Sequence, residues 1–312
     1  MTTTRDIAIT FSGGGNKSFY QLGLLRGWGA RLLERVAAVA ACSAGACVAA
    51  LYLSGREDEV WSFWRERRRA VTRNFEWHRL LRGQRPTPHH EPIYRELLLV
   101  AFDNGGLERI CSQPFPLFVL TALPPRWCPM PAAMLLGLGA HKLEHSLRPD
   151  LIHSTFAARI GFQALAFDAR ECRTREELTD LILASSATPP FTSVGFYAGR
   201  RLLDGGIIDN TPAFLAERAP GVTRNLVLLT QPCVNHLTRQ SSPRLYIAPA
   251  EPLQVKTWDY TRPHLLEATI ARGETDAGRY APLLYQFLGS TLSFELNSQP
   301  RRDEFPYRGA KE

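Results

Sequence analysis

A serine at a tight turn is the first residue whose type and neighbours indicate chemistry. Ser43 stands in the stretch ACSAG, residues 41–45, after one apolar run and before a second. A sharp strand-to-helix turn exposes a serine hydroxyl, and the small residues Ala41, Ala44 and Gly45 keep side chains from colliding across it. The N-terminus of the following helix favours an alkoxide or oxyanion. The pattern predicts a nucleophilic serine, although a small-residue turn packed against a helix has the same composition.

A glycine-rich turn, SGGGNKS at residues 12–18, is the second candidate. A phosphate loop requires G-x-x-x-x-G-K-[ST], but Asn16 stands where its last glycine belongs. A dinucleotide turn requires G-x-G-x-x-G, but Ser18 replaces its final glycine, and no acidic residue ends a second strand about twenty residues later. We therefore interpret Gly13, Gly14 and Gly15 as backbone N–H donors at a helix N-terminus, suited to an oxyanion or a phosphate ester.

An aspartate late in the chain is the third candidate for a functional residue. The stretch LLDGGIIDNTP places Asp204 at the end of an apolar run, followed by Gly205 and Gly206. Those glycines let the backbone fold close to whatever the aspartate faces, although an isolated Asp-Gly pair is normally a turn signal. Asp209 and Asn210, a few residues on, are typical of helix caps.

The elements that must position these residues follow from the hydrophobic pattern. We expect strands at 7–11 and 36–41 and helices at 17–33 and 46–53, with a turn at 42–45 between the second strand and the second helix. This alternation predicts parallel pairing with helical crossovers. The uncharged stretch 36–55 is long enough to span a bilayer, but a buried strand followed by a buried helix has the same profile, and we favour the latter. Further strands are expected at 115–121, 163–167, 225–230 and 245–248, a hairpin at 196–206, and helices at 130–147, 176–184 and 264–288.

Composition is that of a globular protein, with 312 residues of which 45% are hydrophobic and 21% charged. We expect one domain over residues 1–312, with residues 56–160 as an elaborated lid and pocket region. Six cysteines without a CxxC pair indicate reduced thiols. The first residues show no secretory signal, so we expect a cytoplasmic or peripheral membrane protein.

The net charge of +7 predicts attraction to an anionic partner. Eight arginines lie between Arg65 and Arg85, interleaved with aromatic residues, and could contact an anionic membrane, although a solvated helix would look the same. No nucleic-acid motif accompanies them, so nucleic acid is not expected. His141 and His145 have metal-ligand spacing without an evident third ligand, so no metal is expected. His89 and His90 lie in a proline-rich loop and are expected to be exposed.

The four stretches GGGNKS, ACSAG, ASSATPPF and DGGIIDNTP together resemble, in order and context, the patatin-like phospholipase family. They bracket residues 7–212. The resemblance implies an α/β fold, a three-layer α/β/α sandwich with a mainly parallel central sheet. It implies acyl-ester hydrolysis of a phospholipid or other lipid by a Ser–Asp dyad without histidine or cofactor.

Carried onto this sequence, the resemblance makes Ser43 the nucleophile, Asp204 the base and Gly13, Gly14 and Gly15 the oxyanion hole. The remaining motif positions are Asn16, Lys17, Ala41, Gly45, Gly205 and Gly206. A triad with His236 or His264 is the rival, but an α/β-hydrolase expects its nucleophile after several strands and Ser43 follows only the second.

Three positions depart from the family pattern. Ala41 replaces a glycine, Lys17 stands where arginine is commoner, and Ser18 replaces another glycine. Ala41 is acceptable if its φ is negative, and Lys17 keeps the charge but not the forked geometry of arginine. None of the three removes a reacting group. A non-catalytic lipid- or protein-binding member of the same fold, and an acyltransferase that uses the same acyl-enzyme, remain alternatives.

Overall fold

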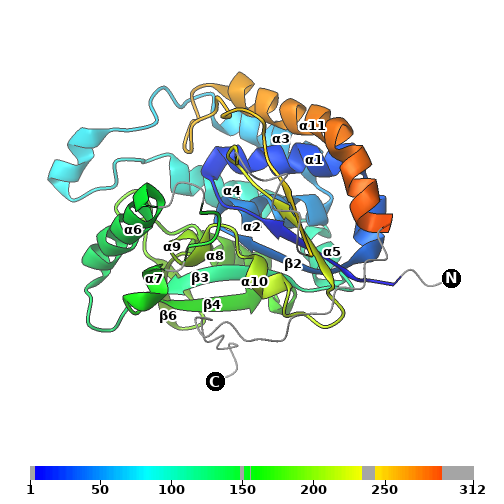
Figure 1. Ribbon diagram of the computed structural model, residues 1–312. Helices are drawn as coiled ribbons and strands as arrows, with labels where there is room; N and C mark the ends of the chain where they lie inside the picture. The colour runs from blue at the N-terminus through cyan, green and yellow to red at the C-terminus, as the bar shows by residue number, and fades with distance from the viewer. Residues whose placement is uncertain (1–3, 148–150, 155, 234–242, 290–312) are drawn as a thin grey trace.

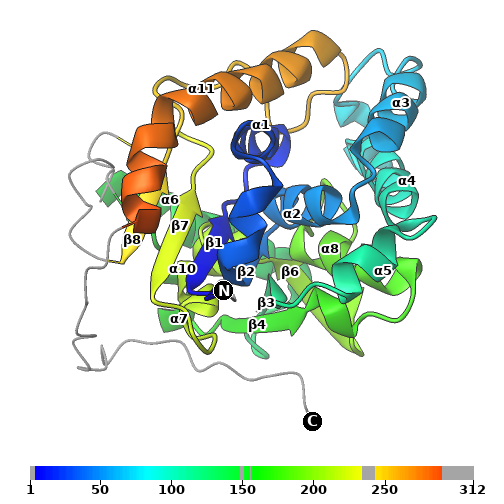
Figure 2. The same cartoon turned by 90° about the vertical axis from the view of Figure 1, so that its right-hand side faces the viewer.

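A single mixed sheet organises the protein, in a computed structural model that describes residues 4–147, 151–154, 156–233 and 243–289. Its order is β5-β6-β3-β2-β1-β7-β8, with β4 paired to β3 (Figures 1 and 2). The pairs β2–β3, β1–β2, β1–β7 and β7–β8 are parallel, whereas β4 and β6 run antiparallel to β3. The strands are β1 (Ile7–Phe11), β2 (Val36–Cys42), β3 (Leu117–Leu123), β4 (Gln163–Asp168), β5 (Gly195–Tyr197), β6 (Arg200–Asp204), β7 (Arg224–Leu228) and β8 (Arg244–Ile247).

Helices cover both faces of the sheet, because the central strands carry apolar side chains on both. In β1, Ile9 and Phe11 pack into one core cluster, and Ala8 packs into another on the opposite face. The first cluster includes side chains of α1 (Phe19–Trp28), α2 (Ala44–Ser54), α3 (Glu57–Arg67), α4 (His90–Phe102), α5 (Gly106–Cys111), α8 (Arg175–Ser185) and α11 (Pro263–Gly289). The second includes side chains of α6 (Met130–Leu147), α7 (Phe156–Arg159), α9 (Gly206–Asp209) and α10 (Ala213–Ala216). This arrangement is the expected α/β/α sandwich.

The first 54 residues follow the expected order of strand, helix, strand, helix. The turn between β2 and α2 is shorter than expected, because Ser43 alone reverses the chain and α2 begins at Ala44. The expected helix over 17–33 is divided into the 3-10 helix η1 (Gly15–Ser18), α1 and the 3-10 helix η2 (Ala30–Arg35). Gly29, with φ of 77°, ends α1, a conformation that glycine adopts without strain.

The segment that could have spanned a bilayer forms β2 and the buried helix α2. No helix in the described part of the chain combines the length and the apolar character needed to cross a membrane.

The helices α1 and α11 cross at two glycines. A Cβ on Gly23 would lie 2.1 Å from the carbonyl oxygen of Ile270, and one on Gly273 would lie 2.2 Å from that of Tyr20. The two backbones therefore approach as closely as glycine allows, which fixes the long C-terminal helix over α1 (Figure 2). Because α1 follows the glycine turn directly, this contact also supports that turn.

Candidate active site

Strand β3 brings Ser43 and Asp204 together. β4 pairs with one edge of β3 over residues 118–123, so β2 and β6 must share its other edge. On that edge Cys42 lies opposite Leu120, and Asp204 lies opposite Thr121. Ser43, which follows Cys42, therefore lies next to Asp204, which ends β6.

The two side chains are in direct contact. The Ser43 hydroxyl donates a hydrogen bond of 2.7 Å to Oδ2 of Asp204, and the N–H of Gly206 donates one of 2.7 Å to Oδ1. Burial raises the pKa of Asp204 to about 6, and the hydrogen bonds from Ser43 and Gly206 oppose the shift. At neutral pH the carboxylate is ionised and yet a stronger base than a free aspartate, which suits it to accept a proton from a hydroxyl.

Ser43 itself has a strained backbone, with φ of 50° and ψ of −135°. A non-glycine residue at such angles indicates a functional constraint and aims its side chain out of the turn. Gly45 makes the turn possible, because a Cβ there would lie 2.6 Å from the carbonyl oxygen of Ser12. Ala41 lies inside β2 and is not among the residues with positive φ, so the methyl group that departs from the family pattern is accommodated.

Ser185 connects the backbone of Ser43 to the strand beside Asp204; it lies in the stretch ASSATPPF, but the sequence assigned it no role. Its hydroxyl accepts a hydrogen bond of 2.8 Å from the N–H of Ser43 and donates one of 2.6 Å to the carbonyl of Leu120. Its own carbonyl accepts from the N–H of Gly205 at 3.1 Å. A Cβ on Gly205 would lie 2.2 Å from the carbonyl oxygen of Leu120, so this position accepts only glycine.

The glycine turn lies beside Ser43, and its three N–H groups are not equivalent. The N–H of Gly13, one of the three predicted oxyanion donors, donates to the carbonyl of Asn210 at 2.9 Å and so already has an acceptor in this structure. Within the described residues, the N–H groups of Gly14 and Gly15 have no hydrogen-bond acceptor. Both line the same cavity as Ser43.

Side chains from distant parts of the sequence hold this turn. The carbonyl of Gly13 accepts from Asn210 Nδ2 at 3.1 Å and from Thr230 Oγ1 at 2.9 Å. Asn16 donates through its backbone N–H to Thr257 and through Nδ2 to the carbonyl of Asp259. Ser18, the unexplained departure from the family pattern, is buried and donates to the carbonyl of Ser12 at 3.2 Å. Lys17 is half-buried and forms no ion pair with the residues that the structure describes.

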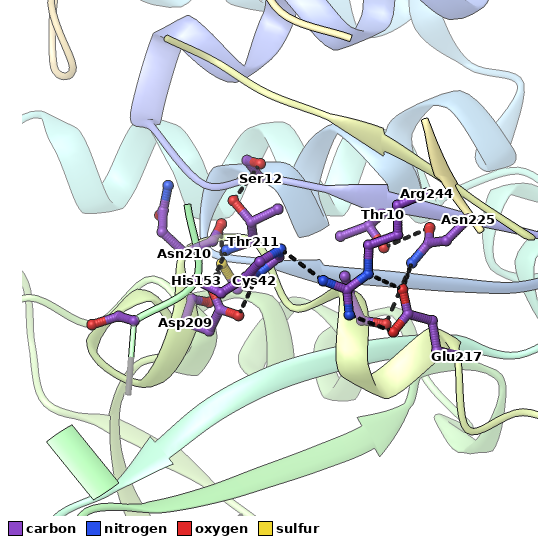
Figure 3. Close-up of polar contacts among 12 residues, drawn as sticks. Thr10, Ser12, Cys42, His153, Asp209, Asn210, Thr211, Glu217, Asn225 and Arg244 are labelled. Atoms are coloured by element: carbon purple, nitrogen blue, oxygen red, sulfur yellow. Dashed lines mark hydrogen bonds and ion pairs between the residues drawn. The ribbon is translucent and has the colours of Figure 1, made fainter. Parts of the chain in front are cut away.

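A partly buried polar network lies next to Asn210 (Figure 3). Asp209 Oδ1 accepts from the N–H of Thr211 at 2.8 Å, as a capping residue would, but its Oδ2 contacts His153 Nδ1 at 2.9 Å. His153 Nε2 is 3.2 Å from Nη1 of Arg244, and Nη2 of Arg244 donates to Glu217 at 2.6 Å. Burial raises the pKa of Asp209, and His153 opposes the shift. The network fixes the segment whose next residue, Asn210, clamps the glycine turn.

A cavity of about 210 Å³ opens above the Ser–Asp pair. Its lining includes Gly14, Gly15, Ser43, Tyr94, Met134, Asp204, Ile207 and Trp258. A narrower recess of about 40 Å³ adjoins it through His90, Tyr94 and Trp258, and apolar side chains of Phe19, Trp64, Ile93 and Leu97 line this recess. Residues 56–160 therefore supply part of the cavity wall.

Histidines do not contact the pair in the described residues, in which Asp204 accepts only from Ser43 and Gly206. His90, expected to be exposed, is buried at the start of α4, and its Nδ1 is 2.6 Å from the hydroxyl of Tyr260. Its aromatic neighbours make that burial favourable, and burial lowers its pKa to about 4. His264 is exposed, and His236 lies outside the described residues. The described side chains form no cluster able to hold a metal ion, and those of His141 and His145 are not among them.

The fold and this arrangement define a class of α/β proteins with a serine at a strand-to-helix turn over a mostly parallel sheet. A family model described as patatin-like phospholipase matches residues 9–217, about two thirds of the sequence. The chain therefore belongs to the patatin-like phospholipase family, whose members are in general lipid acyl hydrolases.

Among solved structures, the chain is similar to VipD from Legionella pneumophila, with a TM-score of 0.45 and 11% identity, over 90% of this chain and 67% of that one. No curated protein matches the sequence.

Proposed function

We propose that this protein hydrolyses fatty-acyl esters of phospholipids or related lipids, with Ser43 as nucleophile and Asp204 as base. The observation that carries the proposal is the 2.7 Å contact between Ser43 Oγ and the partly buried carboxylate of Asp204. The adjoining apolar recess suits an acyl chain, and family membership supports a lipid substrate.

The chemistry follows from the geometry. Ser43 Oγ attacks the ester carbonyl carbon while its proton passes to Oδ2 of Asp204. The N–H groups of Gly14 and Gly15 stabilise the oxyanion that forms on the carbonyl oxygen. The intermediate collapses to an acyl-enzyme, and the leaving alcohol takes the proton from Asp204. Water then attacks the acyl-enzyme with Asp204 as base, which releases the fatty acid and restores Ser43.

Substitution of either member of the pair tests the assignment. In Ser43→Ala and Asp204→Asn, we expect hydrolysis of a lipid panel to fall by at least about a thousandfold, because each removes a reacting group. Circular dichroism spectra and melting curves should show that both variants remain folded. Thr188→Val, which alters another residue of the cavity wall, serves as the matched control and should retain most activity. Full turnover by either dyad variant would exclude the mechanism.

A fluorophosphonate probe separates the alternatives, because it labels only an activated serine. We expect stoichiometric labelling of the wild type and none of Ser43→Ala. An unlabelled wild type would favour a lipid- or protein-binding member of the fold. Product analysis with an added alcohol acceptor then distinguishes a hydrolase, which yields fatty acid, from an acyltransferase, which yields a new ester.

A further inference from the structure

The arginines between Arg65 and Arg85 are mostly neutralised within the protein. Carboxylates lie within 4 Å of five of them, in the pairs Arg65–Glu267, Arg67–Glu96, Arg69–Glu66, Arg79–Glu76 and Arg85–Glu91. Arg68 lies over the ring of Trp64. In the described part of the chain, Arg73 and Arg82 have no ion-pair partner, and both are exposed. The unpaired cationic side chains of this segment therefore lie within residues 73–86, which we call the arm.

The arm also exposes large apolar side chains. Leu81 is 91% exposed, Trp77 58% and Leu80 40%, and all three lie in the 3-10 helix η3 (Trp77–Arg82). The arm is closed on itself, because the N–H of Glu76 donates to the carbonyl of Pro86 at 2.7 Å. Such a cluster in a closed, ordered loop is unfavourable in water and indicates an interaction surface.

Aromatic rings connect the arm to the cavity. Phe75 stacks on Trp77 with their ring centroids 5.2 Å apart, and both lie edge-on to Phe191. The ring centroid of Phe191 in turn lies 4.9 Å from that of Trp258, and Trp258 lines the cavity beside Ser43. The base of the arm is tied to the same loop, because Asn74 accepts from the N–H of Tyr260 at 2.8 Å. The exposed tip is thus held rigidly to the cavity wall.

Helix α6 projects from the same side of the molecule as the arm (Figure 1). Its Leu135 and Leu147 are 71% and 73% exposed, while Met134 lines the cavity. Helix α6 therefore contributes one side chain to the cavity lining and also carries exposed apolar side chains.

We propose that the arm docks onto the surface of an anionic lipid bilayer and brings the cavity opening to the lipid. Trp77, Leu80 and Leu81 enter the boundary between head groups and acyl chains, and Arg73 and Arg82 contact the anionic head groups. The combination of exposed aromatic and aliphatic side chains with unpaired arginines matches such a surface in both polarity and charge. The inference rests on the proposed function, since a lipid hydrolase must reach its substrate at an interface.

The test is co-sedimentation with vesicles of phosphatidylcholine alone or of phosphatidylcholine with phosphatidylglycerol. We expect the wild type to bind the mixed vesicles, with binding that weakens as salt is added. Each cationic side chain at such a surface contributes roughly fivefold to partitioning. The double variant Leu81→Asp/Arg82→Glu, which reverses a charge and removes an apolar contact, should therefore bind at least about tenfold more weakly.

Matched controls separate docking from catalysis. Tyr285→Asp changes a 71% exposed apolar residue of α11, and Arg173→Glu changes an exposed arginine beside η4 (Ala169–Glu171); both should bind vesicles as the wild type does. The arm variant should hydrolyse a soluble short-chain ester at the wild-type rate, whereas Ser43→Ala should bind vesicles normally. Failure of Ser43→Ala to lose hydrolysis would overturn the proposed function and leave docking unaffected.

Two results would overturn the docking proposal. One is an arm variant that binds mixed vesicles as tightly as the wild type. The other is a wild-type protein that does not sediment with the vesicles but binds duplex DNA in a manner that depends on Leu81 and Arg82.

Discussion

Two effects on the pKa of Asp204 oppose each other, since the hydrogen bond from Ser43 lowers it while desolvation raises it to about 6. Desolvation dominates because the residue ends a strand beneath the cavity, and only Ser43 and Gly206 donate to its side chain in the described residues. The raised pKa makes proton transfer from Ser43 less unfavourable than it would be to an ordinary aspartate. At the residue scale, the raised pKa of this carboxylate predicts one contribution to the pH dependence of activity and one to that of stability.

The pH profile of hydrolysis should show the ionisation of Asp204. Because the proposed base Asp204 must be ionised to accept the proton, we expect kcat/KM to fall about tenfold per pH unit below about pH 6 and to level off above it. A histidine could produce a similar limb, so His90→Gln is the control. His90 has a pKa of about 4, and its replacement should leave the midpoint unchanged. A midpoint that moves with His90 would contradict the assignment.

The contribution of Asp204 to the free energy of unfolding should fall as the pH rises, whereas its contribution to activity should increase. A carboxyl whose pKa is raised by folding stabilises the fold below its unfolded value, near 3.8, and this contribution is lost as the pH rises through about 6. Asp204→Asn should therefore be more stable than the wild type at pH 8, by about 2 kcal/mol, with a difference that shrinks toward pH 4. Urea denaturation at pH 5 and pH 8 measures it, and an equal difference at both values would argue against a buried ionised base.

At the scale of elements, the crossing of α1 and α11 determines how the glycine turn is supported. Gly273 allows the backbones to touch, since a Cβ there would also lie 2.9 Å from the Cα of Gly23. A movement of α11 toward α1 would therefore displace α1, which continues directly from the glycine turn. The crossing therefore connects the last described helix of the chain to the backbone donors of the candidate site.

Substitution at the crossing should show this dependence. Gly273→Ala should lower the free energy of unfolding by about 2–3 kcal/mol, because the added methyl group forces the helices apart. Gly278→Ala is the matched control in the same helix, where a Cβ would have no atom within 4 Å, and it should be neutral or stabilising by up to about 1 kcal/mol. Urea denaturation of both variants measures the effect. Equal effects of the two substitutions would show that the crossing is not tightly packed.

For the whole molecule, the sequence predicted most elements because their patterns are local. The helix at 130–147 and the strand at 7–11 have the bounds that apolar periodicity indicated. The exposure of His90 was wrong, because its burial depends on Tyr260 and Trp258, which follow about 170 residues later. The sequence also contained no sign that the N–H of Gly13 donates to the carbonyl of Asn210, because that contact too joins residues far apart in the chain. Motif spacing proposes which residues carry chemistry, but it does not show which of their groups already have hydrogen-bond partners.

The hydrogen bonds that hold the glycine turn determine when the candidate site can form during synthesis of the chain. The turn and Ser43 leave the ribosome first, but Asp204 follows 161 residues after Ser43, and Thr230 follows 217 residues after Gly13. The partner of Asn16 at Asp259 comes 243 residues later. A nascent or truncated chain that ends before these residues carries the serine without its base or its formed donors. The proposed lipid-degrading activity therefore requires that synthesis has continued at least as far as Asp259.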